Sequence, residues 1–103
     1  MTLALEIRDG VAELLLDHPP VNALDSAGWS KLAETLTSLG RGGEARAVVL
    51  GAKGRGFCAG VDIKELAADS SRITRVNRAC FEAFAAVHDC PVPVIAACHG
   101  FVL

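Results

Sequence analysis

The chain has 103 residues, 51% of them hydrophobic, and its ten basic and twelve acidic side chains give a net charge of −2. This length predicts one domain or part of one, and the balanced charge with few aromatic residues argues against a nucleic-acid-binding surface. There is no basic leader and no apolar run of bilayer length, so we expect a cytoplasmic protein without membrane contact.

The chain begins with a predicted β-hairpin. Leu3–Arg8 and Val11–Leu16 are β-like runs joined by Asp9-Gly10, a dipeptide typical of tight hairpin turns with positive φ at both positions. Leu3, Leu5 and Ile7 alternate with smaller or charged residues, so one face of the first strand is expected to be buried.

A helix is predicted next, capped by Asp25 and running to about Leu39, with Gly40 or Gly42-Gly43 as its stop. Its apolar residues recur at helical spacing on one face: Trp29, Leu32, Ala33, Leu36 and Leu39. Trp29 is therefore expected in the core.

The second half alternates strand and helix. Arg46–Leu50 predicts a buried strand, and Ser71 to about His88 predicts a helix that ends before Pro91 and Pro93. Its expected buried stripe is Ile73, Val76, Cys80, Phe81, Phe84 and Val87. With a last strand at Val94–Ala97, the order is β-β-α-β-loop-α-β, which indicates an α/β fold with parallel strands and right-handed crossovers.

The loop at residues 53–65 is the most informative segment. It follows the Arg46–Leu50 strand, carries Gly54, Gly56 and Gly60, and is expected to become helical around Val61–Leu66. Free peptide N–H groups at such a helix start can hold a developing negative charge without any side-chain nucleophile. Phe57 stands where a phosphate-binding P-loop requires Lys, and no acidic strand end follows as a dinucleotide site would need. A purely structural glycine turn is the remaining alternative.

Three blocks, in order, resemble the crotonase (enoyl-CoA hydratase/isomerase) superfamily. The blocks are His18-Pro19-Pro20-Val21-Asn22-Ala23-Leu24, Gly54 to Glu65 (Gly-Arg-Gly-Phe-Cys-Ala-Gly-Val-Asp-Ile-Lys-Glu), and Pro93 to Phe101. The resemblance implies that residues 1–103 form the incomplete N-terminal part of a single acyl-CoA-binding domain with the family's ββα spiral fold. In that family the second oxyanion donor and the acid/base carboxylates come later in the chain.

The resemblance also implies roles for individual residues. The backbone N–H of Val61 is the first oxyanion-hole donor, and coenzyme A, which is part of the substrate, lies along Val21, Asn22, Ala23, Leu24, Ala59, Gly60, Val61, Asp62, Ile63 and Lys64. Neither a cofactor nor a metal is expected, and the full-length protein is expected to be a homotrimer or hexamer. Asp62 is interpreted as a helix cap rather than as an acid or base.

The reaction expected from this resemblance is that of an enoyl-CoA hydratase/isomerase, with the 103-residue chain inactive alone. A finer resemblance, which includes Asn77-Arg78, Cys80-Phe81 and Cys90–Ala97, is to an actinobacterial branch that hydrolytically opens a steroid-derived ring as a CoA ester. A non-catalytic truncated product is the alternative from another class. Lys53, Arg55 and Lys64 are either contacts for the CoA phosphates or a solvated rim. The four cysteines are expected to be reduced and buried.

Overall fold

The computed structural model describes residues 2–103 and has a sheet covered on one face by two long helices. The strands are β1 (Thr2–Arg8), β2 (Val11–Asp17), β3 (Ala23–Leu24), β4 (Ala47–Ala52), β5 (Gly60–Val61) and β6 (Val94–Ala96). The helices are α1 (Ser26–Gly42), α2 (Ile63–Ala68), α3 (Ile73–His88) and the short 3₁₀ helix η1 (Ser70–Arg72). The predicted α/β order is confirmed, with β3, β5 and η1 added.

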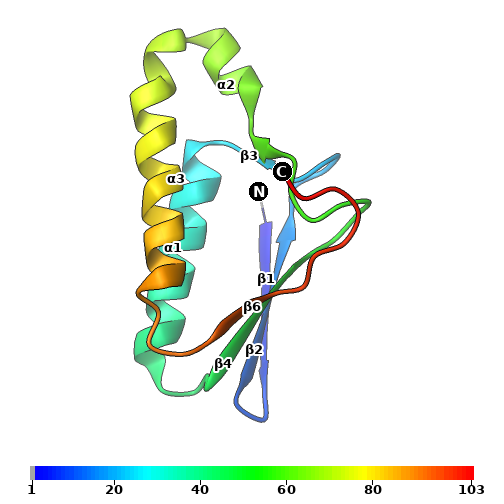
Figure 1. The fold of residues 1–103 in the computed structure, drawn as a ribbon, viewed down its shortest axis with the longest axis vertical. Helices are drawn as coiled ribbons and strands as arrows, with labels where there is room; N and C mark the ends of the chain where they lie inside the picture. Colours follow the sequence, from blue (N-terminus) through cyan, green and yellow to red (C-terminus); the bar gives the residue numbers. More distant parts are fainter. Residues whose placement is uncertain (1) are drawn as a thin grey trace.

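The larger sheet has the order β1-β2-β4-β6. β1 and β2 are antiparallel, whereas β2, β4 and β6 run parallel to one another. The hairpin turn has φ of 52° at Asp9 and 80° at Gly10, as the Asp-Gly dipeptide predicts. Because β2, β4 and β6 are parallel, the segments that leave their carboxyl ends emerge at one edge of the sheet (Figure 1).

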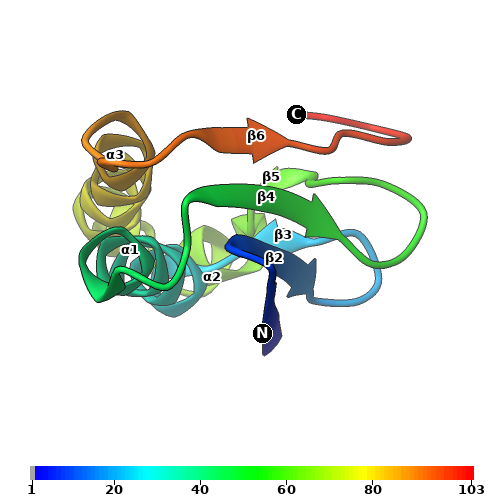
Figure 2. The same ribbon diagram turned by 90° about the horizontal axis from the view of Figure 1, so that it is seen from below.

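α1 begins where the sequence predicts, since the Asp25 carboxylate accepts a hydrogen bond of 2.8 Å from the Gly28 N–H. It ends at the later of the two predicted stops, because Gly43 takes the left-handed conformation with φ of 79°. α1 packs along α3 (Figure 2), and its buried apolar residues share one core cluster with residues of the sheet. Those residues are Trp29, Leu32, Leu36 and Leu39, which meet Leu14, Leu16, Val48 and Leu50.

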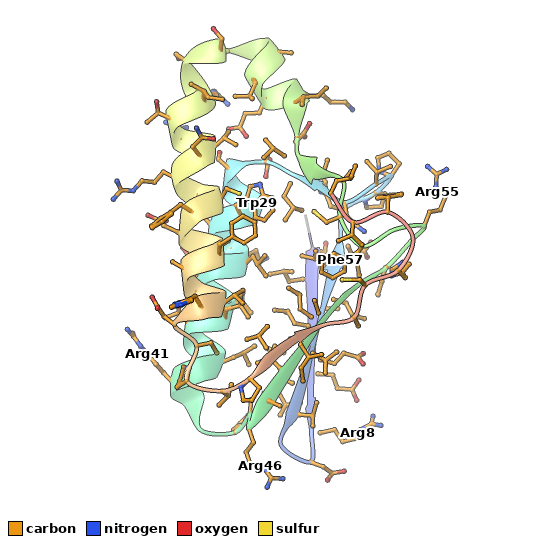
Figure 3. The ribbon with its side chains drawn as sticks, viewed as in Figure 1. Arg8, Trp29, Arg41, Arg46, Arg55 and Phe57 are labelled. Carbon is orange, nitrogen blue, oxygen red and sulfur yellow. The ribbon has the colours of Figure 1, made fainter. Side chains whose placement is uncertain are left out.

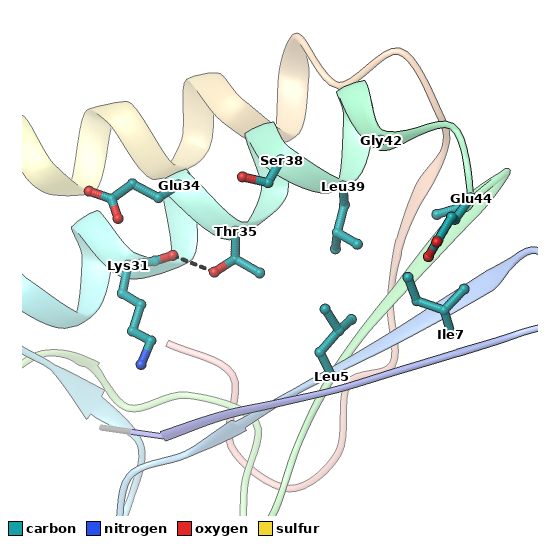
Figure 4. Close-up of a pocket in the computed structure, with 10 residues that line it drawn as sticks. Leu5, Ile7, Lys31, Glu34, Thr35, Ser38, Leu39, Gly42 and Glu44 are labelled. Atoms are coloured by element: carbon teal, nitrogen blue, oxygen red, sulfur yellow. Dashed lines mark hydrogen bonds between the residues drawn. The ribbon is translucent and has the colours of Figure 1, made fainter.

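Two predicted apolar faces are less buried than expected. In β1, Leu3 and Ile7 are half-buried and Leu5 is 47% exposed, because a groove separates β1 from α1 (Figure 4). In α3 the buried residues are Val76, Ala79 and Ala83, while Ile73, Phe81 and Phe84 are exposed. The small alanines of α3 allow close approach to α1. Among the exposed side chains of the predicted stripe, Phe84 still packs its ring against Trp29 of α1, with ring centroids 5.7 Å apart.

Candidate functional site

Three segments that are far apart in sequence lie side by side at the carboxyl edge of the sheet. Residues 18–24 follow β2, residues 53–61 follow β4, and residues 97–103 follow β6. The middle segment pairs with both of the others. β5 pairs in parallel with β3, and Cys58 forms a parallel bridge with Val102. The glycine loop is thereby held from both sides, as the ribbon shows (Figure 1).

Glycine is required where the C-terminal segment crosses the loop. A Cβ atom on Gly56 would lie 2.5 Å from the Phe101 ring, and one on Gly100 would lie 2.1 Å from the Arg55 carbonyl oxygen. The Phe57 N–H bonds the carbonyl oxygens of His99 and Phe101 at 2.9 and 3.0 Å. Close backbone approach therefore fixes the loop, which is the usual reason for glycine at such positions.

Asn22 is a buried brace between the first two segments, with φ of 57° and only 3% of its surface exposed. Its Oδ1 accepts from the His18 N–H at 2.8 Å. Its Nδ2 donates to the carbonyl oxygens of Lys53 and Gly56 at 2.8 and 3.0 Å. These bonds satisfy polar groups in the first part of the glycine loop, at Lys53 and Gly56.

Val61 lies in β5 and not in the first turn of a helix, which corrects the predicted helical range Val61–Leu66. Pairing with Leu24 keeps Val61 extended, so α2 begins only at Ile63. The Asp62 N–H bonds the Leu24 carbonyl oxygen at 2.8 Å. Successive N–H groups of an extended strand point to opposite sides, so the Val61 N–H points away from β3.

Asp62 caps α2, as predicted. Its Oδ1 accepts from the Lys64 N–H at 3.0 Å, while its own N–H bonds the Leu24 carbonyl oxygen. Both interactions fix the direction in which the chain leaves β5. The Asp62 carboxylate is therefore occupied in helix capping, a common use of Asp at a helix start.

A cavity of about 360 Å³ lies between the end of β2 and the start of α2. Seven of the ten predicted ligand-contact residues line it: Val21, Ala23, Ala59, Val61, Asp62, Ile63 and Lys64. The side chains of Asn22 and Leu24 are buried in the interior, and Gly60 does not line the cavity. Contacts from Asn22 and Leu24 to a ligand are thus limited to main-chain atoms.

Sequence reasoning missed three further lining residues, His18, Pro19 and Pro20. Their position directly after a strand that ends at the same sheet edge is the feature that could have indicated them. The groove between β1 and α1 (Figure 4) is larger, at about 480 Å³, and no residue of the glycine loop lines it. Of these two, we assign the candidate site to the smaller cavity, because residues of the glycine loop, including Val61, the predicted donor, line it and do not line the groove.

The side chains near the loop differ in exposure. Lys53 and Arg55 are exposed, and Arg55 projects from the outer side of the loop, whereas Phe57 lies toward the helices (Figure 3). Cys58 is buried, and burial raises the pKa of its thiol, although a backbone hydrogen bond to Gly60 opposes the effect. The protonated Cys58 thiol donates to the Asn22 carbonyl oxygen at 3.1 Å. A protonated thiol is a poor nucleophile, so Cys58 is structural.

All four cysteines are free, but only Cys58 is fully buried, and Cys98 is exposed, which corrects the expected burial of all four. Among residues 2–103, no three His, Cys, Asp or Glu side chains gather in a way that could hold a metal ion. Within the same range no helix has the length and apolar character needed to span a bilayer.

Comparison with known proteins identifies relatives over almost the whole chain. Residues 6–103 match the enoyl-CoA hydratase/isomerase family. A (7aS)-7a-methyl-1,5-dioxo-2,3,5,6,7,7a-hexahydro-1H-indene-carboxyl-CoA hydrolase of Rhodococcus jostii is 48% identical over 95 residues, which are 90% of this chain and 37% of the relative. The hydrolase of the same name from Mycobacterium tuberculosis is 49% identical over 89% of this chain and 38% of its own length.

The fold also has close counterparts among solved structures. An enoyl-CoA hydratase of Mycobacterium smegmatis superposes with a TM-score of 0.84 at 36% identity, covering 91% of this chain and 38% of the other. The chain therefore spans little more than a third of the length of the relatives it matches.

Proposed function

Because the chain belongs to the enoyl-CoA hydratase/isomerase (crotonase) family, we propose that it is the acyl-CoA-binding N-terminal part of such an enzyme. Residues 1–103 would then be an incomplete part of a single domain. The observation that carries the proposal is the placement of the Val61 N–H. In the pairing of β5 with β3 it is the Asp62 N–H that bonds Leu24, so the Val61 N–H is not used there. Val61 also lines the cavity, together with residues 18–21, Ala23, Ala59 and 62–64.

The proposed chemistry is stabilisation of negative charge on a thioester oxygen. When the α-carbon of an acyl-CoA loses a proton, its C–H electron pair moves toward the carbonyl oxygen as an enolate. When water attacks the β-carbon of a 2-enoyl-CoA, the π electrons of the C=C bond move to the same oxygen. A backbone N–H aimed at that oxygen stabilises the charged state more than the neutral thioester, and removing one such donor costs about 3–4 kcal/mol. The Val61 side chain takes no part, so its identity affects only the space above the thioester.

The cavity supports coenzyme A as the bound group. Its wall is mainly apolar, from Val21, Ala23, Ala59 and Ile63, and Lys64 places an ammonium at its rim. Apolar walls with a few polar groups suit the pantetheine arm, and a lysine at the rim can pair with a phosphate. We propose no cofactor apart from the coenzyme A carried by the substrate.

Hydration or isomerisation of an enoyl-CoA is the proposed reaction. It requires a second oxyanion donor and acid/base groups from outside residues 1–103, so we expect the 103-residue chain to show no turnover alone. Assembly into a homotrimer or hexamer is part of the proposal. Large exposed apolar side chains, including Phe81, Phe84 and Ile95, are consistent with further contacts to α3 and β6.

A second candidate is hydrolysis of a C–C bond in a cyclic CoA ester, as in the ring opening of steroid degradation. It is favoured by 48% and 49% identity to two hydrolases named for a dioxo-hexahydroindene-carboxyl-CoA ester. The same donor would serve both reactions, because each develops charge on the thioester oxygen. Assays of the intact protein with a 2-enoyl-CoA and with the bicyclic CoA ester distinguish the two reactions. If neither substrate is turned over, the result supports a non-catalytic product.

The proposal is tested by changing Val61 in the intact protein, including any residues that follow Leu103. Val61→Pro removes the N–H and should lower kcat/KM about a hundredfold or more, as for other oxyanion donors. Val61→Ala keeps the N–H and should retain most of the activity. Thermal unfolding of both variants checks that Pro does not simply unfold the loop. Equal activity in two folded variants would refute donation from this backbone group.

A further inference from the structure

The two helices next to the cavity begin side by side, in matching positions. Leu24 of β3 pairs with Val61 of β5, and each strand is followed by an aspartate, Asp25 or Asp62, that caps the next helix. The first-turn N–H groups of α1 and α2 therefore lie at the same edge. A side chain from one helix can therefore bond the first turn of the other.

Glu65 makes this connection between the two helices. It lies in the first turn of α2, and its carboxylate reaches across to the start of α1, which has no acidic residue in its own first turn. Oε1 accepts from the Ser26 hydroxyl at 2.7 Å and Oε2 accepts from the Ser26 N–H at 2.8 Å. Only 8% of the Glu65 side chain is exposed.

We propose that Glu65 is a positioning residue, which holds α2 against the start of α1 and thereby fixes the Val61 N–H and the cavity wall at Asp62–Lys64. This inference rests on the proposed function of Val61. Two attachments follow the donor: the Asp62 N–H bonds Leu24 immediately after it, and Glu65 accepts from Ser26 one helical turn later. An oxyanion donor must be held close to its productive position, since small displacements weaken catalysis strongly.

Glu65 is not placed to act as the acid or base of the reaction. Both carboxylate oxygens are engaged by Ser26, and Glu65 does not line the cavity. The charged groups around it are Arg72, whose Nη1 lies 3.9 Å from Oε1, and the carboxylates of Asp25 and Asp69. The hydrogen bonds from Ser26 hold the pKa of Glu65 below its ordinary value, so the carboxylate is ionised at neutral pH.

The test uses the intact protein and three variants. Glu65→Ala removes both contacts to Ser26 and should lower kcat about tenfold with KM within about twofold, because the lost interaction acts mainly on the transition state. Glu65→Gln should recover most of kcat, since its amide can accept from the Ser26 N–H and donate to the Ser26 hydroxyl. The control is Glu34→Ala, which removes an exposed carboxylate from α1 and should leave both constants unchanged.

Amide hydrogen exchange of the ligand-free protein provides a readout that does not depend on turnover. Glu65→Ala should accelerate exchange at Asp62 relative to the β4 amides, whereas Glu34→Ala should not. The inference would be overturned if Glu65→Ala lowered only the melting temperature and left kcat and the exchange of the Asp62 amide unchanged. It would also be overturned if Glu65→Gln lowered kcat as much as Glu65→Ala does. If instead Val61→Pro and Val61→Ala are equally active, the function proposed for Val61 fails, which is a separate outcome.

Discussion

At the scale of single residues, Asn22 does more for the site than its predicted contact with coenzyme A suggests. One side chain joins the turn after β2, at His18, to the first part of the glycine loop, at Lys53 and Gly56. Its carbonyl oxygen also accepts the hydrogen bond from the Cys58 thiol. The backbone conformation at Asn22, with φ of 57°, is one that asparagine tolerates better than most residues.

Replacing Asn22 by Ala should lower the free energy of unfolding by about 2–3 kcal/mol, because buried groups at His18, Lys53 and Gly56 lose their partner. Asn77→Ala is the matched control. Asn77 is exposed on α3, and its loss should change stability by less than about 0.5 kcal/mol. Urea unfolding of the two variants and the parent measures the difference. A similar stability for both variants would contradict the bracing role.

The bracing role of Asn22 could not have been predicted from the sequence. Its partners Lys53 and Gly56 are 31 and 34 residues away, and only the packed fold brings them within hydrogen-bond distance. Asp25 and Asp62, by contrast, were predicted correctly as caps, because a cap bonds an N–H two or three residues further along the chain. Local interactions are readable from sequence, whereas long-range ones are not.

At the scale of elements, the strands and helices with strong periodicity were predicted within a few residues. The exceptions have physical reasons. β3 and β5 have two residues each, too few for an alternating pattern, so the extended conformation of Val61 was missed. α3 has two neighbouring apolar stripes, one that contains Ala79 and Ala83 and one that contains Phe81 and Phe84. The sequence alone does not tell which of them α1 covers. Alanines at 79 and 83 decide it, because they permit the closer approach.

The crossing of the glycine loop by the C-terminal segment depends on Gly100. Gly100→Ala would place a Cβ 2.1 Å from the backbone oxygen of Arg55, at a residue with φ of 60°, so stability should fall by about 2 kcal/mol or more. Gly42→Ala is the control, because a Cβ there meets nothing within 4 Å. Since Gly42 is the last residue of α1, alanine should leave stability unchanged or raise it by up to about 1 kcal/mol.

Thermal unfolding of the two glycine variants gives the comparison. A Gly100→Ala protein as stable as Gly42→Ala would mean that residues 99–101 do not lie against Arg55 and Gly56 as described. The bridge between Cys58 and Val102 would then also be in doubt, because it continues the same crossing.

At the scale of the whole molecule, the parallel arrangement of β2, β4 and β6 creates the site. Each strand ends at the same edge, so residues 18–24, 53–61 and 97–103 become neighbours although they are widely separated in sequence. The predicted α/β order already implies that these strands end at the same edge, because strand–helix alternation implies parallel strands. The sequence did not reveal which peptide groups remain free, since that depends on the pairing of β5 with β3.

The central claim is that the Val61 N–H binds the thioester oxygen of an acyl-CoA. Amide hydrogen exchange of the intact protein, with saturating acyl-CoA thioester or with the thioether analogue that lacks the carbonyl, tests it most directly. We predict that both ligands slow exchange along the cavity wall at Ala59 and at Ile63–Lys64, and that only the thioester slows the Val61 amide, by about tenfold or more for a direct hydrogen bond. Exchange at Val61 that is unchanged by the thioester, or slowed equally by both ligands, would contradict the account.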